Sequence, residues 1–74
     1  MNEFGMSFLG TIGKFAFFKV ASVTDPKETS KRIINETSLR RKSAVVVVND
    51  GCNSATLSRI KAGVEEAGMI CKTE

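Results

Sequence analysis

Basic side chains are the groups in this chain whose number and spacing suggest a binding function. Six of them fall between residues 27 and 42, where only Glu28 and Glu36 carry negative charge. Six positive and two negative charges leave this segment at +4, above the +3 of the whole chain. Such a cluster is the usual electrostatic footprint of a polyanionic partner, and it also suits a solvated helix face followed by a basic loop. The six residues are Lys27, Lys31, Arg32, Arg40, Arg41 and Lys42.

No group of residues in the chain indicates catalytic chemistry. Cys52 has no histidine to act as its base, because the chain contains none, and Asp50 is a lone acid without an obvious second carboxylate. A strand that ends at Asn49-Asp50-Gly51 would offer free backbone N–H groups to an anion, but the segment matches neither the Walker nor the dinucleotide glycine pattern. We therefore expect a non-enzymatic protein without a cofactor.

The cysteines and the N-terminal segment indicate where the protein works. Cys52 and Cys71 cannot hold a metal ion without further ligands, so we expect no metal site and two reduced thiols, as in the cytoplasm. Glycines and lysines interrupt the apolar N-terminus, which argues against a secretory signal or a membrane span. A competing interpretation is a short amphipathic helix on a membrane surface, because four apolar residues fall near helical spacing. They are Phe4, Phe8, Ile12 and Phe15.

The length of the chain, 74 residues, predicts one small domain over residues 1–74 with a limited core. All five phenylalanines lie within the first 18 residues, which is more than so small a core is expected to cover. We therefore expect self-association, most simply as a homodimer with some of these rings at the subunit contact.

The N-terminal segment, residues 1–23, is predicted to be a Phe-rich strand or hairpin. Residues 14–23 are mostly β-branched, aromatic or small, and alternation places Phe15 and Phe17 on one face. Residues 10–13 contain two glycines and are expected to turn a hairpin back onto the preceding residues.

Two helices are expected, over residues 25–39 and residues 53–67. Asp25-Pro26 suits the N-cap and the first position of the first helix. The second helix can be capped by Asn53-Ser54, and its apolar residues recur at intervals of three and four. The resulting stripe consists of Leu57, Ile60, Val64 and Ala67.

Residues 43–49 decide the fold, because they contain four consecutive valines and lead into Asn49-Asp50-Gly51. Valine is a poor helix former and a good strand former, so we favour a strand here. A further short strand is expected over residues 69–72, after Gly68 ends the second helix. The chain is then a single α+β domain with an N-terminal strand or hairpin followed by helix, strand, helix and strand.

Residues 51–60 resemble the turn and recognition helix of helix-turn-helix DNA-binding domains, and residues 64–72 look like the end of a winged-helix recognition helix entering its wing strand. This resemblance implies an alternative fold, a winged helix-turn-helix, in which residues 44–50 are helical. The sequence departs from the family pattern at Val47 and Asp50, where a small residue and an apolar residue are expected. The resemblance implies DNA contacts through Ser54, Thr56, Ser58 and Arg59, with Lys61 near a phosphate.

The function that these features favour is a small regulator that binds nucleic acid, DNA before RNA, through a basic surface. The alternative is a protein-interaction module or inhibitor whose Phe-rich N-terminus docks on a partner, with the basic residues serving solubility. Membrane binding is not expected. The predicted nucleic-acid contacts are Lys31, Arg32, Arg40, Arg41, Lys42, Ser54, Thr56, Ser58, Arg59 and Lys61.

Overall fold

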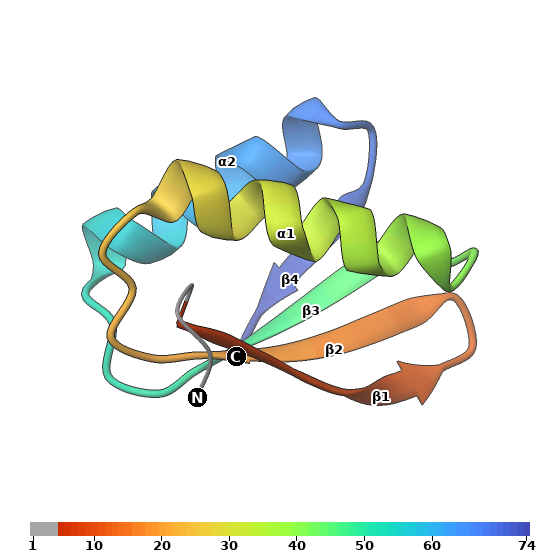
Figure 1. Ribbon diagram of the computed structural model, residues 1–74, viewed down its shortest axis with the longest axis horizontal. Helices are drawn as coiled ribbons and strands as arrows, with labels where there is room; N and C mark the ends of the chain where they lie inside the picture. The colour runs from red at the N-terminus through yellow and green to blue at the C-terminus, as the bar shows by residue number, and fades with distance from the viewer. Residues whose placement is uncertain (1–4) are drawn as a thin grey trace.

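The computed structural model describes residues 5–74, so Phe4 and the three residues before it lie outside the described part. It contains four strands and two helices in the order β-β-α-β-α-β, which confirms the predicted α+β class (Figure 1). The elements are β1 (Met6–Ile12), β2 (Phe15–Val20), α1 (Pro26–Leu39), β3 (Ala44–Asn49), α2 (Ser54–Glu66) and β4 (Ile70–Thr73).

The four strands form one mixed sheet in the order β1-β2-β3-β4. β1 runs antiparallel to β2, while β2, β3 and β4 are parallel to one another. The two helical connections step the same way across the sheet, and connections of this kind are right-handed almost without exception. Both helices therefore lie on one face of the sheet (Figure 1). Among the described residues, no element covers the opposite face.

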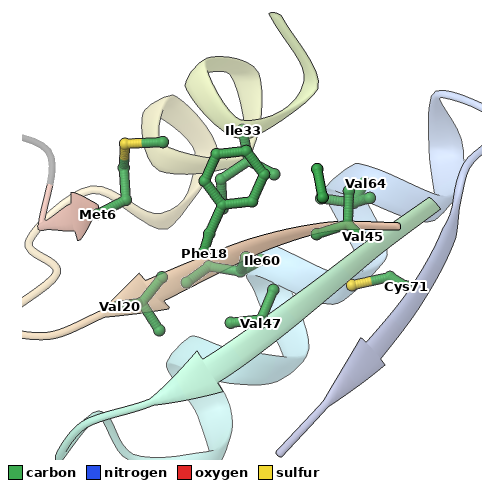
Figure 2. Close-up of a cluster of buried hydrophobic side chains, with 10 residues drawn as sticks. Met6, Phe18, Val20, Ile33, Val45, Val47, Ile60, Val64 and Cys71 are labelled. Carbon is green, nitrogen blue, oxygen red and sulfur yellow. The ribbon is translucent and has the colours of Figure 1, made fainter. Parts of the chain in front are cut away.

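The core fills the space between the helix layer and the sheet (Figure 2). Residues at alternate positions of β2 and β3 point into it, as Phe18 and Val47 do from neighbouring positions of the two strands. Even Val46, which points away from the helices, is only 4% exposed. A run of β-branched residues suits a strand in the middle of a sheet, and the predicted strand is confirmed. The core residues are Met6, Ala16, Phe18, Val20, Ile33, Val45, Val47, Ile60, Val64 and Cys71.

The two helices approach each other closely where Gly63 of α2 faces Ser30 of α1. A Cβ atom added at Gly63 would lie 2.8 Å from the Ser30 Cβ atom and 2.6 Å from its Oγ atom. The buried Ser30 hydroxyl donates a hydrogen bond of 3.1 Å to the carbonyl oxygen of Ile60. The glycine thus permits a close approach that a larger residue would prevent.

The turn of the N-terminal hairpin is shorter than the predicted turn at residues 10–13. β1 continues through Ile12, which pairs with Phe15, so only Gly13 and Lys14 connect the strands. Gly13 has a φ of +57°, the left-handed geometry that two-residue hairpin turns require. The register shifts between Phe8 and Gly10, so Gly10 belongs to an irregularity within β1 and not to the turn. Residues 6–12 and 15–20 are strands, which corrects the competing interpretation of an amphipathic helix there.

A side-chain cap and a residue with positive φ define the two ends of α1. The Asp25 carboxylate accepts a hydrogen bond from the Glu28 backbone N–H at 3.2 Å, and Pro26 opens α1, which confirms the predicted cap. At the other end Arg41 has a φ of +58°. The N–H groups of Arg41 and Lys42 donate to carbonyls of the last helical turn, which is the Schellman arrangement that usually carries glycine at this position.

Candidate nucleic-acid interface

The predicted contact residues are divided between the helix layer and the start of the parallel strands. Lys31 and Arg59 come together in the helix layer, where they line a shallow groove between α1 and α2. Lys27 lines the same groove together with Asp25 and Glu66, so the two acidic side chains partly offset the positive charge of the groove. Arg32 is exposed elsewhere on α1.

The start of α2 is preceded by a strand, β3, in the place where a helix-turn-helix motif has its first helix. The connecting loop is fixed by Asn49, whose side-chain amide donates to the Cys52 carbonyl at 3.0 Å and accepts from the Cys52 N–H at 2.9 Å. Asn53 then caps α2 by accepting a hydrogen bond of 2.8 Å from the Thr56 N–H. Side chains of the loop thus occupy two of the backbone N–H groups that an anion would need. Ser54 and Ser58 are exposed beside them.

Lys61 points toward a different part of the molecule from Arg59. Its charge acts on Cys71 of β4, together with that of Glu65. Burial raises the pKa of the Cys71 thiol, the negative charge of Glu65 adds to this rise, and Lys61 opposes it. The predicted contacts of α2 therefore do not form one surface.

Two of the three basic residues after α1 have structural partners. The Arg40 guanidinium lies 3.7 Å from the centre of the Phe8 ring and pairs with the Glu36 carboxylate. The Lys42 ammonium donates a hydrogen bond of 2.9 Å to the carbonyl oxygen of Gly13, which ties the start of β3 to the hairpin turn. Arg41 is exposed at the same end of the sheet.

A second set of cations gathers on the uncovered face of the sheet. Phe15, Phe17 and Lys19 alternate along β2 with three fully buried residues, so their side chains point away from the helices. The register then places Lys72 of β4 on that face, in the row that contains Phe17. We define the open face as the residues whose side chains share this orientation. They are Ser7, Ile12, Phe15, Phe17, Lys19, Ala44, Val46, Val48, Ile70 and Lys72.

Positive charge concentrates at one end of the open face, around Phe15. The ammonium groups of Lys14 and Lys72 lie 5.8 Å and 5.3 Å from the centre of its ring. Because parallel strands start at the same edge of a sheet, the residues just before β2 and β3 also meet here. We call Lys14, Arg41, Lys42 and Lys72 the basic edge.

Negative charge lies at the other end of these strands. Asp50 follows β3 and pairs with Lys19 at 3.4 Å. Glu74 follows β4, and its carbonyl oxygen accepts a hydrogen bond from the Asn49 N–H. The open face is thus polarised along its strands, with an apolar and aromatic centre and a basic end.

No protein-family model matches the chain. Searches of curated proteins and of solved structures also gave no match. Within residues 5–74, no three histidine, cysteine, aspartate or glutamate side chains group closely enough to hold a metal ion. No helix of this part is long and apolar enough to cross a membrane.

The lysines of the open face were missing from the sequence-based prediction. Lys19 could have been found, because it continues the alternation that places Phe15 and Phe17 on one face. Lys72 could not, because its position depends on how β4 pairs with β3 across an intervening helix. A count of charges along residues 27–42 finds only residues that are neighbours in the sequence, whereas the basic edge joins residues from three separate segments of the chain.

Proposed function

We propose that the protein is a small non-enzymatic regulator that binds nucleic acid at the basic edge of its sheet. The observation that carries the proposal is the placement of Lys14 and Lys72, whose ammonium groups both lie within 6 Å of the Phe15 ring. Lys42 is hydrogen-bonded to the residue that precedes Lys14. Like charges held this close repel one another and lower stability, so their gathering favours a function that needs them.

A polyanion is the partner that fits this arrangement. Phosphates that meet the four cations of the basic edge would release bound counterions, and this release makes affinity fall steeply with salt. For single strands the log–log slope is about −0.7 per contact, so four contacts predict a slope of about −3. The acidic side chains in the groove between the helices make that surface a poorer site for phosphates.

The expected homodimer and the cytoplasmic setting extend this proposal. Two copies would double the number of cations that one nucleic-acid strand meets. The thiols of Cys52 and Cys71 are free, which suits a reducing compartment.

A second candidate function is docking of a protein partner on the open face. Ile12 is 71% exposed and Ile70 is 47% exposed, and exposed apolar residues on a sheet without a cover favour protein contacts. In this case the lysines would serve solubility.

Salt-dependent binding of fluorescent oligonucleotides distinguishes the two candidates. The double variant Lys14→Ala with Lys72→Ala should weaken binding. It should also reduce the log–log slope of affinity against salt by the contribution of about two phosphate contacts. The matched control is Lys31→Ala with Arg59→Ala, which removes the same charge from the helix groove. Lys42 and Arg40 are left intact because they hold the hairpin and Phe8.

Binding at the basic edge predicts the larger loss of affinity in the first double variant, whereas binding in the helix groove predicts it in the control. Equal or greater loss in the helix-groove variant would move the interface away from the basic edge. No binding of the wild-type protein to single-stranded or duplex oligonucleotides at low salt would refute the proposal. Protein docking on the open face would then take its place.

A further inference from the structure

We propose that the ligand is a single strand whose bases stack on Phe15 and Phe17 of the open face. This inference rests on the proposed nucleic-acid function and adds the class of nucleic acid and the mode of contact. Single-strand binders combine cations that follow the backbone with aromatic rings on which bases stack. The open face places both kinds of group together, because Phe15 lies beside Lys14 and Lys72.

The spacing of the two rings suits an extended strand. Phe15 and Phe17 are two positions apart on β2, which is about 7 Å along a strand. Stacked bases in a duplex are about 3.4 Å apart, so a duplex cannot place one base on each ring. In a duplex the faces of the bases are also covered by their neighbours. A single strand can separate two successive bases and place one on each ring.

The ammonium groups of Lys14 and Lys72, which lie over the Phe15 ring, do not prevent a base from stacking on it. A lysine over a half-buried surface ring such as Phe15 contributes about two- to fivefold to an equilibrium constant. A stacked base contributes about 5- to 150-fold. A base can therefore displace the ammonium groups of Lys14 and Lys72, which remain near the ring and meet the phosphates on either side.

Charge also favours a polyanion over a second copy of the chain on this face. Two copies that met through their open faces would have to remove Lys14 and Lys72 from water, along with Lys19. Of these, Lys19 has a carboxylate partner, the Asp50 side chain. Desolvation of a charged group without a partner is costly, whereas a phosphate backbone supplies the partner.

Tryptophan fluorescence can test this inference, because the chain contains no tryptophan and no tyrosine. The variant F17W places one indole on the open face. The matched control F8W places it on the helix side of the sheet, where Phe8 packs against Phe18 with ring centres 5.5 Å apart. Each variant is titrated with oligothymidine and oligouridine of about ten nucleotides, and with a duplex of the same length.

The expected result is quenching of F17W by both single strands at concentrations at which F8W is unchanged. Duplex should bind more weakly and quench neither variant. A separate comparison uses anisotropy, in which F17L should lower single-strand affinity about 5- to 150-fold and F17Y should restore it. Circular dichroism confirms that each variant is folded.

Three results would overturn the inference, and they differ in what else they refute. If duplex binds as tightly as single strands without quenching F17W, the stacking inference fails and the proposed nucleic-acid function stands. If no oligonucleotide binds, both fail. If the emission of F17W changes with protein concentration alone, the open face is covered by a second copy rather than by bases.

Discussion

Replacement of Gly63 by alanine tests how closely the two helices pack. The added methyl group would lie 2.8 Å from the Ser30 Cβ atom, about 1 Å inside normal carbon–carbon contact. In an exposed helix position this change would stabilise the protein by about 1 kcal/mol, because alanine is the better helix former. Overpacking here costs about 1–3 kcal/mol. Separation of the helices would also break the buried hydrogen bond from Ser30 to Ile60, which costs about 1–3 kcal/mol more.

The balance of these effects predicts that Gly63→Ala lowers the free energy of unfolding by about 1–5 kcal/mol. Since 1 kcal/mol shifts the midpoint of a domain this size by about 4–8 °C, the melting temperature should fall by roughly 5–40 °C. Urea unfolding followed by circular dichroism measures the change. Ala62→Gly, at the exposed neighbouring position, calibrates helix propensity alone and should cost about 1 kcal/mol.

The double variant Gly63→Ala with Ser30→Gly distinguishes a clash from a general weakening of the helices. Ser30→Gly removes the two atoms that the new methyl group would meet, so the double variant should be more stable than the sum of the single effects predicts. A Gly63→Ala protein as stable as the wild type, or more stable, would refute the close packing of α1 on α2.

Three further predictions concern backbone strain and the thiols. Arg41→Gly should raise the melting temperature, since Arg41 has a φ of +58° and the left-handed conformation costs a non-glycine residue about 1–2 kcal/mol; a lower value would contradict the Schellman ending of α1. Gly5→Ala should destabilise the fold by more than about 2 kcal/mol in urea unfolding, because the new Cβ atom would lie 2.6 Å from the Ala21 carbonyl oxygen; unchanged stability would count against that contact. Because the pKa of Cys71 is raised above the ordinary 9.0, its contribution to stability is complete below pH 9.0 and is lost as the pH rises through the folded-state value. Cys71→Ala should reduce this alkaline loss, and a thiol reagent should modify Cys52 before Cys71; equal modification rates would refute the burial of Cys71.

Local features of the sequence were enough to predict most of the secondary structure. The valines of β3 form a strand because β-branched residues pack well on a pleated surface, and this strand lies in the middle of the sheet. Asp25 and Asn53 cap their helices because their side chains reach backbone N–H groups three residues ahead. Such contacts span a few residues, so the types of those residues determine them.

Contacts between distant segments account for what the sequence could not show. The predicted turn at residues 10–13 was too long, because the pairing of β1 with β2 extends to Ile12 and a shift near Gly10 absorbs the irregularity. Arg40, one of the predicted nucleic-acid contacts, lies against Phe8, a residue more than thirty positions earlier in the chain, and nothing in the sequence indicated this contact. The basic edge depends in the same way on the register of β4.

Chemical-shift mapping tests the central claim most directly. Isotope-labelled protein titrated with oligothymidine should show the largest amide shifts in β2 around Phe15 and Phe17, in the hairpin turn at Lys14, and in β4 around Lys72. The first turn of α2 and the groove at Arg59 should change little. Shifts concentrated in α2 and that groove, or no shifts at low salt, would contradict nucleic-acid binding at the basic edge.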